Sequence, residues 1–158
     1  MNVAFINPFI QSILDVLSTM AGLEARPGRP AIKENATARG DVTGIIGMAG
    51  EQVSGSLAVC FTEAVIIEIS RRMLGEAPAT IDESVTDMVG ELTNMVTGGA
   101  KKLLAEDGYD FDMAIPAVFS GKEHTINHKS SGATIILPFD TDAGAFFIEI
   151  CFKEKGAS

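Results

Sequence analysis

The feature that most constrains the fold is a long helical periodicity in residues 81–106. When this segment is wound at about 100° per residue, one stripe becomes apolar and must face a core. That stripe consists of Val85, Met88, Val89, Leu92, Val96, Gly99 and Leu103. Thr80 and Glu83 have the spacing of a capping box at the start of the segment, and Gly108 follows its end. The sequence therefore predicts one long amphipathic helix over this segment.

Two shorter helices are predicted elsewhere in the chain. Asn7-Pro8 has the pattern of an N-cap followed by proline at the first helical position, and apolar residues recur at helical spacing over residues 9–20. Gly22 is placed to end that helix. Another helix is expected over residues 63–74, and Gly75 follows its last residue.

The remaining apolar runs are predicted strands. They cover about residues 42–48, 53–61, 111–119, 133–139 and 145–152. Gly50-Glu51-Gln52 favours a hairpin between the first two strands, and residues 140–144 form a turn between the last two. This order of elements predicts an α+β fold in which an antiparallel sheet is packed by long helices. We expect residues 1–158 to form a single domain.

Composition and charge exclude several kinds of partner. The chain carries a formal net charge of −9, which repels nucleic acid and anionic lipid. Cys60 and Cys151 each lie in an apolar run, as buried thiols do in a reducing compartment. No run reaches the roughly 18 apolar residues of a membrane span, and residues 1–20 lack the basic start of a signal peptide. We therefore expect a cytoplasmic protein.

The polar side of the long helix carries the candidate functional residues. They are Asp87, Glu91, Asn94, Gly98 and Lys101. Glu91 and Asn94 are three residues apart, so they are neighbours on the helix surface. Gly98 and Gly99 each cost about 1 kcal/mol relative to alanine in a helix, which indicates that another chain segment approaches closely. We expect Gly99 to admit a strand and Gly98 to admit the backbone of a partner.

The pattern Asp87-x3-Glu91-x2-Asn94, with Pro116 twenty-two positions after Asn94, resembles the motif of the CheC/CheX/FliY family of chemotaxis phosphatases. The length and the single clear copy of the motif are most similar to the CheX branch. The resemblance implies a phosphatase that hydrolyses the aspartyl-phosphate of a CheY-like response regulator in chemotaxis. It implies that Asn94 orients the attacking water and that Glu91 docks a lysine of the regulator.

The same resemblance implies the cofactor and the partners. The phosphorylated regulator supplies Mg²⁺, and this chain needs no cofactor and no metal ligands of its own. Asp87, Gly98 and Lys101 are expected to line the surface that binds the regulator. Residues 133–152 are long and apolar, and an unprotected sheet edge there would invite pairing with another chain. The family also implies a homodimer joined through sheet strands, which would cover such an edge.

Other interpretations of these residues remain open. A polar helix face is commonly just solvated, and a protein of this fold can bind a regulator as a non-catalytic adaptor, without hydrolysis. Asp87 can equally be an acidic residue that favours the helix dipole, and Pro116 can simply end or bend an edge strand.

Two weaker patterns complete the set of candidates. Gln11-x3-Asp15-x2-Ser18 repeats the spacing of the main motif, and we interpret it as a degenerate copy because serine is too short to replace a carboxamide. Ordinary amphipathicity produces the same spacing. His124 and His128 lie four apart in a polar stretch, residues 121–132, which we expect to be a loop without the third ligand that a zinc site needs.

Overall fold

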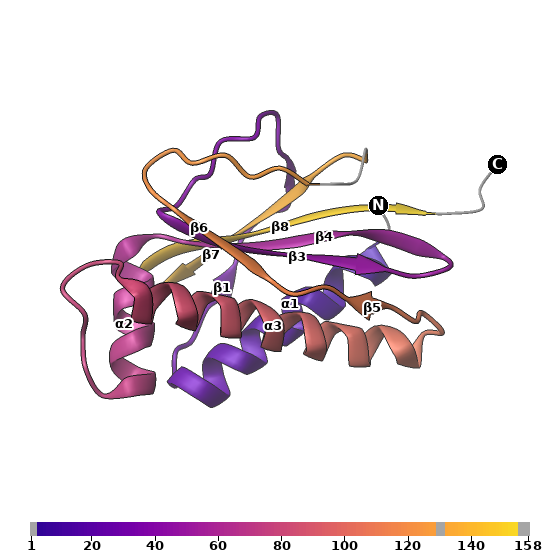
Figure 1. The fold of residues 1–158 in the computed structure, drawn as a ribbon. Helices are drawn as coiled ribbons and strands as arrows, with labels where there is room; N and C mark the ends of the chain where they lie inside the picture. The colour runs from indigo at the N-terminus through magenta and orange to yellow at the C-terminus, as the bar shows by residue number, and fades with distance from the viewer. Residues whose placement is uncertain (1–2, 129–131, 155–158) are drawn as a thin grey trace.

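The sheet carries helices on one face and two long loops on the other, as Figure 1 shows. The computed structural model describes residues 3–128 and 132–154. Its helices are α1 (Val3–Ala21), α2 (Glu63–Leu74) and α3 (Glu83–Glu106). Its strands are β1 (Arg26–Pro27), β2 (Ala31–Ile32), β3 (Val42–Ala49), β4 (Val53–Phe61), β5 (Asp112–Met113), β6 (Ala117–Ser120), β7 (Ile135–Thr141) and β8 (Gly144–Glu154). The predicted α+β class, with an antiparallel sheet packed by helices, is confirmed.

The strands form one antiparallel sheet in the order β1-β7-β8-β4-β3-β5, and in addition β2 pairs with β7 and β6 with β3. β8 lies between β7 and β4, and β1 and β2 cover the outer side of β7. Residues 133–152 therefore do not form an unprotected edge of the sheet. That segment is apolar because it is internal to the sheet, whereas the short strands β1, β2, β5 and β6 form the two edges.

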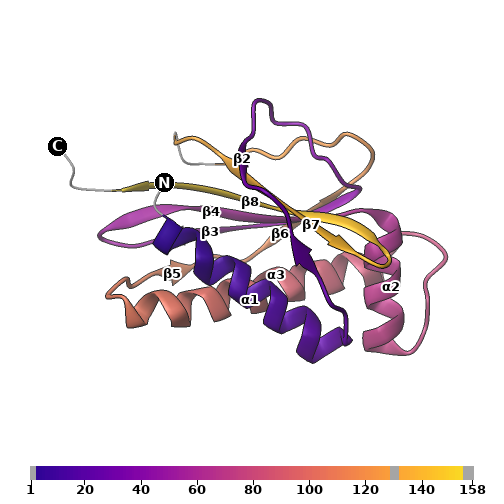
Figure 2. The same ribbon diagram turned by 180° about the vertical axis from the view of Figure 1, so that it is seen from behind.

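The two halves of the sheet repeat one topology. α1 is followed by β1, β2 and the β3–β4 hairpin, and α3 is followed by β5, β6 and the β7–β8 hairpin. The short strands are exchanged between halves, because β1 and β2 pair with β7 while β5 and β6 pair with β3. α1 and α3 lie side by side under the same face of the sheet (Figure 2). The two helices thus hold corresponding places in the two halves.

The start of α1 differs from the prediction. The helix begins at Val3 and Pro8 lies inside it, so Asn7 is not its cap. The side chain of Phe5 is buried and stacks edge-on with Phe111 and Phe152, with ring centroids 5.9 and 4.8 Å away. Burial of this extra turn offsets the backbone hydrogen bond that proline removes. Gly22 does end the helix, and its N–H donates to the carbonyl of Ser18.

The start of α3 also differs from the prediction. The helix begins at Glu83, and its cap is Asp82, not Thr80. The Asp82 carboxylate accepts hydrogen bonds from the Ser84 hydroxyl and from the backbone N–H of Val85, at 2.6 and 3.1 Å. These two bonds, the first above all, lower the pKa of Asp82. A carboxylate at this position also meets the positive end of the helix dipole.

The strand predicted over residues 111–119 is two strands. β5 pairs with β3 through Asp112 and Met113, and β6 pairs with β3 from Ala117 onward. Pro116 stands immediately before β6. Since proline has no N–H to donate to a ladder, continuous pairing is interrupted at this point.

Two glycines set the packing of α3. A Cβ at Gly44 of β3 would collide with Thr93 Oγ1, so this glycine lets the helix lie directly on the sheet. Gly99 was expected to admit a strand, but it faces α1, where a Cβ would collide with Ser12 Oγ. The buried Ser12 hydroxyl donates to the carbonyl of Val96 at 2.7 Å. Gly99 therefore sets the contact between the two long helices.

Candidate functional site

The solvent side of α3 presents a carboxylate and a carboxamide next to each other. Asp87, Glu91 and Asn94 are all exposed, and Gly98 and Lys101 are half-buried. Within residues 3–128 and 132–154, the side chains of Glu91 and Asn94 make no hydrogen bond or ion pair. Both groups are therefore available to an incoming molecule. The apolar stripe of the same helix is buried from Val85 to Leu104, which fixes the outward direction of the polar face.

The positions one helical turn before and one turn after Asn94 are both glycines. Gly90 precedes it by four residues and Gly98 follows it by four, so the three lie on one side of the helix. A Cβ at Gly90 would touch Val118 of β6 at 3.4 Å, whereas a Cβ at Gly98 would meet nothing within 4 Å. The helix surface beside Asn94 is consequently bounded by β6 at one end and open at the other.

This site offers no catalytic group that works alone. A carboxamide donates and accepts hydrogen bonds but does not take up a proton at neutral pH. In the described part of the chain, three or more His, Cys, Asp or Glu side chains nowhere gather as they would around a metal ion. What the pair can do is position: Asn94 can hold a water molecule, and Glu91 can pair with a cation.

The corresponding face of α1 is arranged differently. Gln11, Asp15 and Ser18 are all exposed, at the same spacing as the α3 residues. Here Gln11 Nε2 donates to Asp15 Oδ1 at 2.9 Å. The amide and the carboxylate of this face are thus already paired with each other.

The two histidines hold the loop layer against the sheet. His124 bonds Thr43 Oγ1 through Nε2 at 2.6 Å and the Gly121 carbonyl through Nδ1 at 2.7 Å. His128 bonds Ser56 Oγ at 2.5 Å and Glu149 Oε1 at 3.1 Å. Every ring nitrogen is engaged in a structural hydrogen bond, so neither ring presents a metal-binding nitrogen. Residues 129–131 of the predicted loop lie outside the described residues.

One buried ion pair in this layer was not predicted from the sequence. Lys33 Nζ lies 2.5 Å from Glu149 Oε2, and only 3% and 1% of the two side chains is exposed. Glu149 is the only charged residue in the apolar run 145–152, and that isolation was the available clue. A buried carboxylate requires a partner, which Lys33 and His128 provide.

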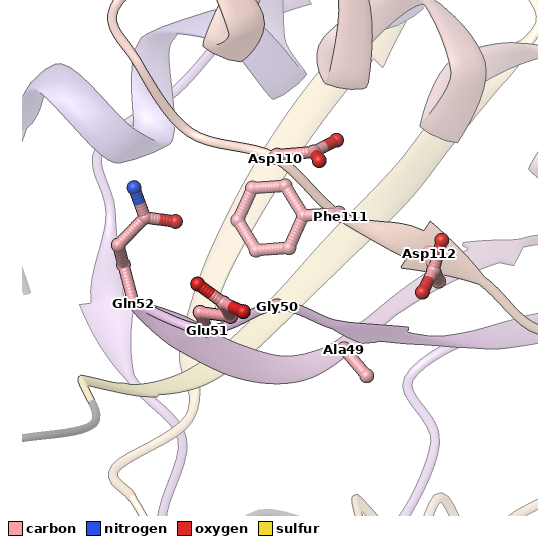
Figure 3. A pocket seen from close by; sticks show the side chains of 7 residues that line it. All are labelled: Ala49, Gly50, Glu51, Gln52, Asp110, Phe111 and Asp112. Carbon is pink, nitrogen blue, oxygen red and sulfur yellow. The ribbon is translucent and has the colours of Figure 1, made fainter.

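Two of the clefts in the described part of the chain contain several charged side chains. The larger, of about 420 Å³, lies between residues 49–52 of the β3–β4 turn and residues 110–112 (Figure 3). Its charged side chains are Glu51, Asp110 and Asp112, and it contains no residue of the α3 motif. The smaller, of about 300 Å³, is lined by Lys33, His128 and Glu149 among others. Lys33 and His128 both bond Glu149, so the charged groups of the smaller cleft are already paired. Neither cleft is assigned a function.

The two cysteines are buried free thiols, as the sequence predicts. Cys60 and Cys151 are buried and form no disulfide. Burial raises the pKa of the Cys60 thiol, which keeps it protonated. Within the described ranges, every helix is too short or too polar to span a membrane.

Comparison with known proteins gives a consistent result. The family model described as "Chemotaxis phosphatase CheX" matches residues 42–140. The CheY-P phosphatase CheX of Thermotoga maritima is 27% identical over 139 residues, which are 87% of this chain and 88% of that protein. A crystal structure of a CheC-like superfamily protein from Shewanella sp. PV-4 is 60% identical, with a TM-score of 0.91 over 97% of this chain and 99% of that chain.

Two further crystal structures extend this comparison. The chemotaxis protein CheX from Vibrio vulnificus is 58% identical, with a TM-score of 0.89 over 94% of this chain and 99% of that chain. A CheX–CheY–BeF3–Mg²⁺ complex from Borrelia burgdorferi has the same fold, with a TM-score of 0.80 at 24% identity over 97% of this chain and 100% of that chain.

Proposed function

The chain belongs to the chemotaxis phosphatase CheX family and is a phosphatase, and we propose that its substrate is the aspartyl-phosphate of a CheY-like response regulator. The observation that supports this substrate is the outward, internally unpartnered pair of Glu91 and Asn94 on an open helix face. A convex face without a deep pocket suits a substrate group that is itself recessed in another protein. The 27% identical Thermotoga maritima protein is a CheY-P phosphatase.

Asn94 supplies the positioning in this proposal. Its carboxamide enters the regulator's site and holds one water molecule in line with the phosphorus and the aspartyl oxygen. Attack forms a P–O bond to the water oxygen and breaks the P–O bond to the aspartate, which leaves as a carboxylate. The products are inorganic phosphate and the free regulator. Since such transition states are loose, positioning and charge stabilisation account for most of the acceleration.

Glu91 and its neighbours supply the docking. The Glu91 carboxylate pairs with a lysine of the regulator and thereby sets the register in which Asn94 approaches the phosphoryl group. Asp87 lies one turn before Glu91 and extends the acidic surface. Gly98 admits the regulator's backbone beside Asn94, and Lys101 closes the far end of the contact.

The remaining parts of the proposal concern the metal and the assembly. The Borrelia burgdorferi complex contains CheY, BeF3 and Mg²⁺, and we place the Mg²⁺ of this reaction in the regulator. We also propose that the protein works in the cytoplasm and forms a homodimer through sheet strands. The two edges of the sheet are at β1 and β2 and at β5 and β6.

Release of phosphate from a phosphorylated CheY-like regulator tests this function. The wild-type chain should accelerate release in the presence of Mg²⁺, and Asn94→Ala should not, although it still binds the regulator. Equal, slow release with both proteins despite binding would instead identify a non-catalytic adaptor. No binding and no acceleration across a panel of regulators would refute the assignment of the substrate.

A further inference from the structure

The segment between β5 and β6 exposes one large apolar side chain beside the site. Ile115 is 91% exposed, more than any other large hydrophobic residue in the described part of the chain. The next, Ile32, is 65% exposed and lies at the opposite edge of the sheet, in β2. Docking of a partner on this isoleucine would remove its apolar surface from water, which is favourable.

The backbone on both sides of Ile115 is fixed. The N–H of Ala114 donates to the carbonyl of Gly47 at 3.0 Å, and Ala117 pairs with Ile45 in the ladder between β6 and β3. Pro116, which is half-buried, restricts the backbone between these two anchors. A side chain presented from a restrained backbone loses little conformational entropy on binding.

Ile115 lies along the part of α3 that carries Asn94. A Cβ at Gly90 would meet Val118 at 3.4 Å, so β6 passes beside this turn of α3. Both α3 and the chain from residue 118 back to residue 114 run toward the β3–β4 turn, as Figure 1 also shows. Three extended residues bring Ile115 about 10 Å from Val118 along that direction. Along the helix, Asn94 lies about 6 Å and Gly98 about 12 Å beyond Gly90. Along the helix direction, the backbone at Ile115 is therefore about level with the segment between Asn94 and Gly98.

We propose that Ile115 is an apolar anchor that contacts the surface of the regulator next to its phosphorylated aspartate. This inference rests on the proposed function and adds the second element of the docking surface. Asn94 and Glu91 contribute polar contacts from α3, and Ile115 contributes a hydrophobic contact from the corner between β5 and β6. The matching feature of the regulator is an apolar side chain or patch at the rim of its acidic site.

The local chemistry favours a regulator over a second copy of this chain at Ile115. Extension of a sheet by another chain needs a row of free backbone N–H and C=O groups. Pro116 has no N–H, so the edge is interrupted beside Ile115. The row of Gly90, Asn94 and Gly98 begins beside Val118 of β6, and it is the row that the regulator is proposed to occupy.

Variants at two exposed isoleucines test the inference. Ile115→Ala and Ile115→Asp are compared with Ile32→Ala and Ile32→Asp, which make the same changes at the opposite sheet edge. The regulator is used phosphorylated, for rates, and loaded with beryllofluoride and Mg²⁺, for binding. Ile115→Ala should raise the regulator concentration at half-maximal rate and the dissociation constant about tenfold, with the maximal rate unchanged. Ile115→Asp should raise both further, and the Ile32 variants should stay within about twofold of wild type.

The outcomes separate this inference from the proposed function. If Asn94→Ala is inactive but the Ile115 variants behave like the Ile32 variants, the anchor is wrong and the function stands. If Ile115→Asp lowers the molar mass measured by light scattering, the residue belongs to a contact between copies, and the anchor is again wrong. If wild type does not accelerate phosphate release, the function fails. In that case only the binding measurements test the anchor. If the chain does not bind the loaded regulator, or if the Ile115 and Ile32 variants have equal dissociation constants, the anchor is wrong.

Discussion

The outer faces of α1 and α3 have the same motif spacing, but the polar side chains are paired with each other on α1 and free to bind a partner on α3. Both helices precede a pair of short strands and a hairpin, and both present a polar residue at each of three corresponding positions. On α1, Gln11 and Asp15 bond each other, and Ser18 is too short to reach far from the helix. On α3, Glu91 and Asn94 bond nothing in the described structure. Spacing alone therefore does not make a site, because the side chains must also be long enough and unpaired.

The largest expected effect is at Asn94. Asn94→Ala should lower the acceleration of regulator dephosphorylation about 100-fold, because the attacking water is no longer held in line. Ser18→Ala makes the corresponding change on α1 and should leave the rate unchanged. Rates of phosphate release with a single phosphorylated regulator provide the measurement. A large loss of rate with Ser18→Ala would show that the α1 face is a working site.

The next effect is at Glu91. Glu91→Ala should raise the regulator concentration at half-maximal rate about 30-fold, since an ion pair at the docking surface is lost. Asp15→Ala is the matched change on α1 and should alter neither the rate nor the affinity. Titration of both variants with the beryllofluoride-loaded regulator measures the affinity directly. A fall in the maximal rate of Glu91→Ala, with unchanged affinity, would contradict the docking role.

Adjacent glycines on α3 should respond in opposite directions. Gly99→Ala should destabilise the fold by about 2 kcal/mol, because the methyl group collides with Ser12 and disturbs its bond to Val96. Gly98→Ala should stabilise the fold by about 1 kcal/mol, because its methyl group points into open space and alanine favours helix. Urea unfolding measures both. Equal destabilisation by the two changes would show that the contact between α1 and α3 is not at Gly99.

The smallest effect is expected on α2, outside both faces. Hydrogen bonds from Arg71, and then from Arg72, lower the pKa of Glu68 from its ordinary value of 4.5 to about 2. Its contribution to stability is therefore present above about pH 4.5 and is lost as the pH falls toward 2. Glu68→Gln should thus unfold at a slightly lower urea concentration than wild type at pH 7, and the difference should vanish near pH 2. Phosphatase activity should not change, and a persistent difference at pH 2 would contradict the assignment.

Much of the fold was predictable because it follows from periodicity. The apolar stripe of α3 and the apolar runs of β4 and β8 each gave an element at nearly its observed position. The short strands β1 and β2 were missed, because two-residue strands carry no repeating pattern. The starts of α1 and α3 were predicted at the wrong residues. Burial of the first turn extends α1 to Val3, and the Asp82 cap starts α3 at Glu83.

The candidate site was predictable in its residues but not in its surroundings. Glu91 and Asn94 could be named because a helix places residues three apart side by side. That Val118 lies beside Gly90 of the helix depends on the pairing of β6 with β3, which no local pattern encodes. The interpretation of residues 1–158 as a single domain stays a prediction.

Asn94→Asp tests the central claim most directly, because it keeps the shape of the side chain while it replaces the amide donor with a carboxylate oxygen and adds a negative charge. The measurement is the rate of phosphate loss from the regulator in a single turnover, with the chain in saturating excess. Our account predicts that the variant still binds the beryllofluoride-loaded regulator, while the rate falls about 100-fold toward the regulator's own. A wild-type rate for Asn94→Asp at saturation would contradict it, since the carboxamide would then not be what positions the water.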